Sequence, residues 1–183
     1  MHFFIGIVPP DEYVCQTTRF QRQWPNNALP QDVEPHITVK AQGGLTPDGS
    51  WIDAVKCVCS GFPAFQVSLH QPMFFSRDVL FLSVRSEKIH SLHERLVHAI
   101  SPSTELIKRY FELESYSPHL TLGQTYWGLT HEELMQMLRK AEQELTPYPT
   151  FDVNFVRIYR EIERDRYVKY VDVPLARSEK GCS

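Results

Sequence analysis

The apolar residues of this chain recur with two different periods, which predict helices and strands in alternation. Residues 2–8 are mostly apolar and predict a buried first strand. After Pro10, apolar side chains return every three or four positions, which is typical of one face of a helix. The same spacing recurs further along and is interrupted each time by Pro or Gly. We therefore expect four helices, over residues 10–24, 46–60, 87–101 and 130–145.

Strict alternation of apolar and polar residues marks several of the remaining strands. Phe-Gln-Val-Ser-Leu alternates cleanly within residues 64–75, and the turn 76–78 joins this strand to another over 79–85, as in a hairpin. The stretch 103–117 fits either a short helix or a packed loop. The other expected strands cover residues 35–41, 118–126, 151–160 and 167–174.

The predicted elements occur twice in the same order: strand, helix, short strand, helix, strand. This order indicates a duplicated unit with pseudo-two-fold symmetry, whose halves are residues 1–76 and 79–175. We therefore predict an α+β fold in which residues 1–183 form one domain, with two lobes that share a central groove.

The two short strands carry the same motif. One reads Pro-His-Ile-Thr-Val and contains His36 and Thr38, and the other reads Pro-His-Leu-Thr-Leu and contains His119 and Thr121. Successive side chains of a strand point to opposite faces, so the His and Thr of each copy share a face. Two imidazoles supply a general base and a general acid, and two hydroxyls donate hydrogen bonds to an anion. The motifs predict phosphate-ester chemistry without a metal or another cofactor.

Composition and charge narrow the class of partner. The chain has 183 residues, a net charge of −3 and an isoelectric point near 6.2, which argues against a protein that coats duplex nucleic acid. A nucleotide or the end of a single-stranded RNA remains compatible with a local pocket. No apolar run is long enough to span a membrane, and no signal pattern opens the chain. We expect a cytoplasmic monomer.

Cysteine and the other histidines indicate no metal site. Cys15, Cys57, Cys59 and Cys182 show no Cys-x-x-Cys or zinc spacing, so we expect reduced thiols. His90, His93 and His98 lie along one predicted helix without a carboxylate or thiol that completes a ligand set. A solvated or half-buried helix face is the expectation for them.

Other residues are candidates for contacts with the substrate. Lys40 lies two positions after Thr38 and can add positive charge near a phosphate. Phe75 and Tyr126 are candidates to stack on a base, although aromatic residues in strands more often belong to a core. Tyr116 precedes the second motif, and we expect it to help orient that strand, together with Ser117.

Paired His-x-Thr motifs in an α/β chain of this length resemble the 2H phosphoesterase superfamily, and within it the bacterial proteins named after 2′-5′ RNA ligase. The specific part of the resemblance is His36, Thr38, His119 and Thr121, with the strand at residues 3–7 and Lys40 as further similar features. It implies two antiparallel sheets with helices packed outside. It also implies metal-independent cleavage of nucleotide phosphodiesters, commonly a 2′,3′-cyclic phosphate opened to a 2′-phosphate, or cleavage and joining of 2′-5′ linkages.

The resemblance implies roles as well, with His119 as base and His36 as acid, whereas the residues by themselves leave this order open. Two positions depart from the family. Many ligase-like members have a basic residue shortly after the second motif, where this chain has Gln124, and an Arg near the start, where it has His2. Less positive charge disfavours long RNA substrates and ligation.

Two other classes of function remain open. The first is a nucleotide- or RNA-end-binding module that keeps the pocket but has little turnover. The second is a metal hydrolase that uses the two histidines as ligands, although it needs a third ligand and neither motif contains a carboxylate.

Overall fold

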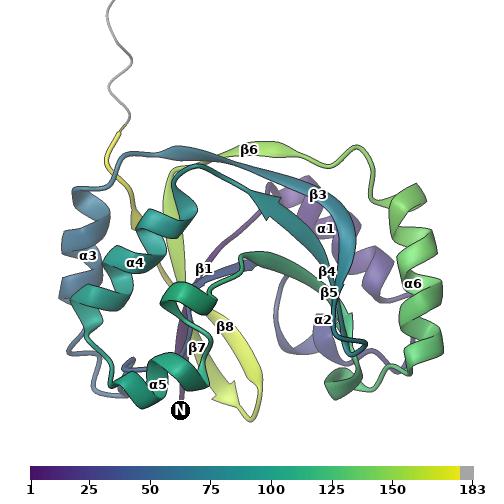
Figure 1. The fold of residues 1–183 in the computed structure, drawn as a ribbon, viewed down its shortest axis with the longest axis horizontal. Coiled ribbons are helices and arrows are strands. Elements are labelled where there is room, and N and C mark those ends of the chain that lie inside the picture. The colour runs from purple at the N-terminus through teal and green to yellow at the C-terminus, as the bar shows by residue number, and fades with distance from the viewer. Residues whose placement is uncertain (178–183) are drawn as a thin grey trace, which may run out of the picture.

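The computed structural model describes residues 1–177, and the eight strands within them form one antiparallel sheet. The strand order is β6-β3-β4-β5-β2-β1-β7-β8. In Figure 1, α3 and α4 lie on one side of the molecule, and α1 and α6 lie on the other. The strands are β1 (Phe3–Ile7), β2 (Ile37–Lys40), β3 (Phe65–Phe75), β4 (Val79–Arg85), β5 (His119–Gln124), β6 (Thr150–Val153), β7 (Phe155–Glu163) and β8 (Arg166–Pro174). The helices are α1 (Asp11–Gln21), α2 (Leu29–Asp32), α3 (Ile52–Ser60), α4 (Ile89–Ile100), α5 (Thr104–Arg109) and α6 (His131–Glu144), with short 3-10 turns η1 (Leu113–Ser115) and η2 (Thr125–Trp127).

The predicted α+β class is confirmed, but the expected two separate sheets are not. The motif strands β2 and β5 are neighbours at the centre of the sheet, and they pair at one residue pair, Ile37 with Leu120. Four strands lie on either side of this junction. The eight strands therefore form one continuous sheet. Because a single residue pair joins its two groups of four strands, the sheet still has two distinct halves.

The two halves of the chain interleave. The strand β3 comes from the first half of the sequence, yet it pairs with β4 and β6 of the second half. The helix α1 packs against β5, and α4 packs against β2, so each motif strand is supported by a helix from the other half of the chain. The boundary between the chain halves is therefore not the boundary between the sheet halves.

Most predicted elements lie where expected. Thr130 and Glu133 form the predicted capping box at the start of α6. The strand predicted over 151–160 is divided at Asn154, because β6 pairs with β3 in one half of the sheet and β7 pairs with β1 in the other. The stretch 103–117 contains α5 and η1. The short helix α2 was not predicted.

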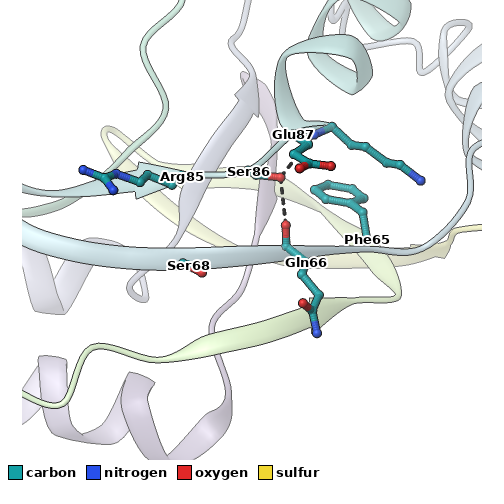
Figure 2. Close-up of a pocket in the computed structure, with 7 residues that line it drawn as sticks. Phe65, Gln66, Ser68, Arg85, Ser86 and Glu87 are labelled. Atoms are coloured by element: carbon teal, nitrogen blue, oxygen red, sulfur yellow. Dashed lines mark hydrogen bonds between the residues drawn. The ribbon is translucent and has the colours of Figure 1, made fainter.

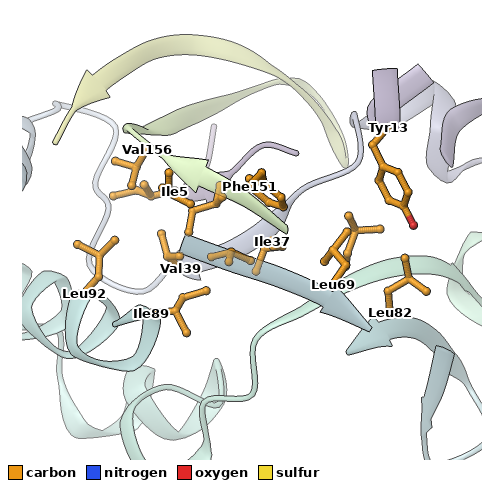
Figure 3. Packing of buried hydrophobic residues seen from close by; sticks show 14 of the residues in the cluster. Ile5, Tyr13, Ile37, Val39, Leu69, Leu82, Ile89, Leu92, Phe151 and Val156 are labelled. Atoms are coloured by element: carbon orange, nitrogen blue, oxygen red, sulfur yellow. The ribbon is translucent and has the colours of Figure 1, made fainter. Parts of the chain in front are cut away.

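The core fixes which face of each motif strand reaches solvent. Ile37 and Leu120 are fully buried on the side of the sheet away from the motif histidines, and Figure 3 shows Ile37 and Val39 among other apolar side chains. Burying such a side chain contributes roughly 1.5–3 kcal/mol. A shift of one residue would turn these side chains outward and the histidines inward, so the core specifies the register.

No helix in the described part of the chain combines the length and the apolar character needed to cross a membrane. Cys15, Cys57 and Cys59 are free, as predicted. Cys182 lies outside the described residues.

Candidate active site

The register of β2 and β5 brings the two motifs together in a crossed arrangement. Ile37 lies opposite Leu120, and residues opposite each other in an antiparallel pair have numbers with a constant sum, here 37 + 120 = 157. Since 36 + 121 and 38 + 119 also equal 157, the histidine of each motif faces the threonine of the other. The lining of two adjacent pockets agrees, because one contains His36 and Thr121 and the other contains His119 and Thr38.

Both histidines are anchored in the same way. The Nδ1 atom of His36 lies 2.8 Å from the carbonyl oxygen of Glu34, and Nδ1 of His119 lies 2.7 Å from that of Ser117. A carbonyl only accepts, so Nδ1 carries the proton in each ring and Nε2 keeps a free lone pair when the ring is neutral. A proline separates each histidine from its acceptor and restricts the acceptor residue to extended backbone. This explains why Pro occurs in both copies of the motif.

The environment lowers the pKa of both imidazoles. Burial lowers the pKa of His36 to about 4, and the nearby His119 adds to the effect, against the hydrogen bond to the Glu34 carbonyl and the Glu34 carboxylate. Burial also lowers the pKa of His119, to a smaller extent, against its hydrogen bond to Ser117. The two rings therefore differ in how readily they take up a proton.

A side chain from the other half of the chain holds the backbone of each motif threonine. The Tyr116 hydroxyl donates to the carbonyl oxygen of Thr38 over 2.9 Å, and Nε2 of the buried Gln21 donates to that of Thr121 over 3.2 Å. These hydrogen bonds help to hold β2 and β5 in place, because the two strands pair with each other at only one residue pair. Within residues 1–177, neither threonine hydroxyl has a hydrogen-bond partner, so both remain available to a ligand.

A network of charged and aromatic residues supports His36. The carboxylate oxygen Oε1 of Glu34 accepts from the guanidinium of Arg157 at 2.7 Å and from the Tyr159 hydroxyl at 2.8 Å. Phe4 stacks on Tyr159, and the His36 ring lies 4.7 Å from the Phe4 ring. The residue whose carbonyl orients His36 is therefore itself fixed through its side chain.

The surroundings of His119 are aromatic instead. Its ring meets Phe75 at a centroid distance of 4.9 Å and Phe81 at 5.3 Å, both edge-on, and the two phenyl rings stack on each other. Its anchoring residue Ser117 is exposed, and among the described residues its hydroxyl has no hydrogen-bond partner.

Two pockets meet at the motifs and form the groove. The pocket on the His119 side has a volume of about 480 Å³ and is bounded by Phe75 and Val79 from the β3–β4 hairpin and by the segment 110–117. The pocket on the His36 side has a volume of about 310 Å³, and its walls include Phe4, Trp127 and Tyr167. Volumes of this order fit small-molecule ligands. Thr38, Ala41 and Tyr110 line both pockets, so the two are adjacent.

Lys40 is not placed as a free cation near a phosphate, as the sequence suggested. It is fully buried, and its ammonium donates to the carbonyl oxygens of Ala41 and Gly43 and to Glu112 Oε1 at 2.7 Å. Burial lowers the pKa of Lys40 and raises that of Glu112, while their mutual contact opposes both shifts. The pair ties the end of β2 to the segment 110–113 that forms a groove wall.

The two aromatic candidates have different positions. Phe75 lines the pocket on the His119 side, half-buried, with one face on Phe81. Tyr126 is exposed and lines neither pocket, and its hydroxyl donates to Asp165 at 2.7 Å. Asp165 does line the pocket on the His36 side, so Tyr126 supports the groove from outside.

Sequence reasoning missed several residues of the site. His93, expected on a solvated or half-buried face, is buried: Nδ1 donates to the Val39 carbonyl at 2.8 Å and Nε2 accepts from the Leu113 amide at 2.8 Å. Its ring stacks on Tyr116. Glu34 was missed as well. Its position two residues before His36, which matches that of Ser117 before His119, is the sequence signal that could have identified it.

Another pocket, of about 550 Å³, lies at the far end of the β3–β4 hairpin. It contains Phe65, Gln66 and Arg85, and Ser86 Oγ donates to the Gln66 carbonyl at 2.8 Å (Figure 2). Phe65 is separated from Phe75 by the length of β3, roughly 30 Å along the strand. This pocket is therefore separate from the motifs. Within residues 1–177, no cluster of three or more His, Cys, Asp or Glu side chains is arranged to hold a metal ion.

The curled antiparallel sheet and its central pair of His-x-Thr strands define a class of α+β proteins in which the histidine of each motif lies opposite the threonine of the other. The family model described as the 2′-5′ RNA ligase superfamily matches residues 9–165, and this chain belongs to that superfamily. The match supports the predicted relationship to the 2H phosphoesterases, and with it a phosphoesterase activity.

Solved structures share this fold. A structure of TT0787 of Thermus thermophilus has a TM-score of 0.62 at 16% identity, covering 97% of this chain and 100% of that one. Escherichia coli LigT complexed with 3′-AMP has a TM-score of 0.61 at 17% identity, covering 96% and 98%. LigT complexed with NADP⁺ has a TM-score of 0.59 at 18% identity, covering 96% and 97%. None of the curated proteins searched matches this sequence.

Proposed function

We propose that this protein is a metal-independent phosphodiesterase that acts on 2′,3′-cyclic phosphates or 2′-5′ linked nucleotides, with His36 and His119 as its acid and base. The observation that carries the proposal is the crossed arrangement of the motifs. Each histidine has Nδ1 occupied by a backbone carbonyl and Nε2 free, and each faces a threonine whose hydroxyl has no partner among the described side chains. Such a pair surrounds one phosphate from two sides.

The reaction adds one water molecule across a P–O bond. The neutral histidine takes a proton from the attacking water as its oxygen bonds to phosphorus, and the protonated histidine gives a proton to the ribose oxygen as that P–O bond breaks. Thr38 and Thr121 donate hydrogen bonds to the phosphate oxygens that gain charge in the transition state. A cyclic phosphate opened in this way gives one phosphomonoester and one free ribose hydroxyl.

The resemblance to the family favours His119 as the base and His36 as the acid. Burial lowers the pKa of both rings, which keeps the base neutral near neutral pH. The negative charge of a bound phosphodiester raises the pKa of both rings and stabilises the protonated acid. In the reverse direction of the reaction the two roles exchange.

A nucleotide or the end of a single-stranded RNA is the proposed substrate, bound by a cytoplasmic monomer. The net charge of −3 and the uncharged Gln124 at the wall of the groove disfavour a long RNA track. LigT, which shares the fold, has been crystallised with 3′-AMP and NADP⁺, and this is compatible with a nucleotide in the corresponding groove here.

Hydrolysis of 2′,3′-cyclic AMP in EDTA tests the proposal, with 2′-AMP and 3′-AMP separated by chromatography. We expect turnover to one isomer, and its loss in both His36→Ala and His119→Ala. Turnover that EDTA abolishes would indicate a metal hydrolase instead. Folded wild type without turnover of cyclic or 2′-5′ linked substrates, and with nucleotide affinity equal to that of the His36→Ala/His119→Ala double variant, would indicate a binding module.

A further inference from the structure

We propose that the buried His93 is a positioning residue of the active site, which fixes the backbone of Thr38 and the anchor of His119 relative to each other. It acts through its neighbour Tyr116 and exchanges no proton in the reaction. The inference rests on the proposed function, because it concerns the same two motifs. It adds to them a third histidine, from α4, that belongs to neither motif.

Both nitrogen atoms of the His93 ring are used, each by a different part of the chain. Nδ1 donates to the carbonyl oxygen of Val39 in β2, and Nε2 accepts from the Leu113 amide, each over 2.8 Å. A carbonyl only accepts and an amide N–H only donates, so both bonds require a neutral ring with its proton on Nδ1. Burial lowers the pKa of His93 to about 4, against its bond to Val39 and with a contribution from Lys40, which keeps the ring neutral near pH 7.

The face of the same ring fixes Tyr116. The two rings stack with their centroids 3.8 Å apart and their planes 7° apart, and the Tyr116 hydroxyl donates to the carbonyl oxygen of Thr38 over 2.9 Å. By the register of β2 and β5, Thr38 lies opposite His119, yet the two strands pair at one other position only. The position of Thr38 relative to His119 therefore depends on Tyr116, and that of Tyr116 depends on the His93 ring.

Tyr116 also directly precedes the residue that anchors His119. The carbonyl oxygen of Ser117 lies 2.7 Å from Nδ1 of His119 and sets the direction of this imidazole. A shift of the Tyr116 backbone moves this carbonyl as well, because the two residues are adjacent in the chain. Through one aromatic neighbour, His93 thus reaches both His119 and the threonine that lies opposite it, Thr38.

The groove wall after α5 has a backbone conformation that needs such support. Phe111 and Leu113 are both left-handed, with φ values of 54° and 56°. Residues other than glycine occupy this region only where their surroundings impose it. Glu112 is held by Lys40, and the Leu113 amide is held by His93. Two buried side chains therefore fix consecutive residues of the wall, and loss of the His93 bond frees the second of them.

Two substitutions of His93 separate its ring face from its nitrogen atoms. His93→Leu removes both hydrogen bonds and the stacking ring, whereas His93→Phe removes the hydrogen bonds and keeps a ring to stack on Tyr116. We expect His93→Leu to lower kcat for 2′,3′-cyclic AMP by roughly 10- to 100-fold and to change KM less, which is the scale for a small misplacement of reacting groups. His93→Phe should recover part of this loss. Equal kcat values in the two variants would overturn the role of the stack.

Tyr116→Phe keeps the stack, removes only the hydroxyl that holds Thr38, and leaves the core around His93 intact. If His93 acts through Tyr116, kcat of His93→Leu/Tyr116→Phe should be about as low as that of the slower single variant. Losses that multiply would contradict this route. His98→Phe is the matched control, because His98 is an exposed histidine of the same helix, and it should leave kcat unchanged. Circular dichroism and thermal unfolding check that each variant is folded.

The proton position on each imidazole provides a second readout that does not depend on turnover. Nitrogen-15 NMR near pH 7 should show the proton on Nδ1 of both His36 and His119 in the wild type. His93→Leu should give His119 a mixture of the two tautomers and leave His36 unchanged, because the His36 anchor, Glu34, belongs to a separate network. An unchanged His119, or equal changes in both rings, would overturn the proposal. If the wild type hydrolyses no substrate but His119 alone responds, the proposed function fails while the positioning role stands.

Discussion

The two motif strands carry the same side chains in the same geometry, but their surroundings differ. On both, a proline precedes the histidine, Nδ1 is held by the carbonyl two residues earlier, and the threonine backbone is held by a side chain from the other chain half. The Glu34–Arg157–Tyr159 network holds the His36 side, whereas the ring edges of Phe75 and Phe81 surround His119. The shared features position the two motifs in the same way. Burial lowers the pKa of both histidines, and the Glu34 carboxylate opposes this shift at His36.

The two motif strands also differ in sequence at the position four residues after each histidine. The first has Lys40 at this position, in a buried ion pair, and the second has Gly123. A Cβ atom at Gly123 would lie 2.5 Å from Leu129 and 2.9 Å from Met137, so the second strand packs against α6 where the first reaches toward the groove wall. The repeat is therefore retained where the four motif side chains line the groove and is lost just beyond it.

The largest expected effect comes from removing either reacting group. His36→Ala and His119→Ala should each lower kcat by roughly 10²–10⁴-fold, because each removes a proton-transfer step. Steady-state hydrolysis of a cyclic or dinucleoside substrate measures the loss. A variant of either histidine that retains more than half of the wild-type kcat would show that the two strands are not functionally equivalent.

The buried ion pair predicts a large effect on stability. Lys40→Met leaves Glu112 buried without its partner, and the free energy of unfolding should fall by about 3–5 kcal/mol. The double variant Lys40→Met/Glu112→Leu should recover most of this loss, because no uncompensated charge remains. Urea denaturation measures both. Equal stability of Lys40→Met and wild type would contradict the structural role.

The threonine pair provides a symmetric test. Thr38→Val and Thr121→Val keep the shape of the side chain and remove a hydroxyl from opposite strands. Each should lower kcat by roughly 10²–10³-fold and change KM little, as expected for donors to a developing charge. Losses that differ between the two by more than tenfold would contradict the crossed arrangement.

Substitutions of Glu34 and Ser117 test whether the side chains of these two residues contribute differently to holding His36 and His119. Glu34→Gln weakens the contacts with Arg157 and Tyr159, and we expect a loss in kcat of about tenfold, the scale of roughly 1.4 kcal/mol. Ser117→Ala keeps the carbonyl that holds His119 and should leave kcat unchanged. Since the Glu34 charge raises the pKa of His36, Glu34→Gln should also shift the acidic limb of the pH–rate profile to lower pH. An unshifted limb would assign Glu34 a purely structural role.

The smallest expected effect is the position of the pH optimum. In the free protein His36 becomes neutral above a pKa of about 4, and His119 becomes neutral above a pKa that lies below its ordinary value of 6.5. The optimum of kcat/KM should therefore fall below pH 6.5, and that of kcat should lie higher because bound phosphate raises both pKa values. A kcat/KM optimum above pH 7 would contradict the lowered values.

The motifs and most elements were predictable because their signals are local. The alternation of Phe-Gln-Val-Ser-Leu, the Thr130 capping box and the repeated Pro-His-x-Thr each lie within a few residues. The join between β2 and β5 rests on a single long-range pair, and the interleaving of the chain halves depends on which helix covers which strand, so neither leaves a local pattern. Lys40 illustrates the limit: its place on the strand was clear, but its partner Glu112 lies 72 residues away.

A double-mutant cycle on His36 and His119 tests the central claim most directly, namely that the two strands contribute one acid–base pair to one reaction. If they do, kcat of His36→Ala/His119→Ala should be about as low as that of the slower single variant, because groups that act as a unit are lost together. Losses in the single variants that multiply in the double variant would show two independent contributions and would contradict the account.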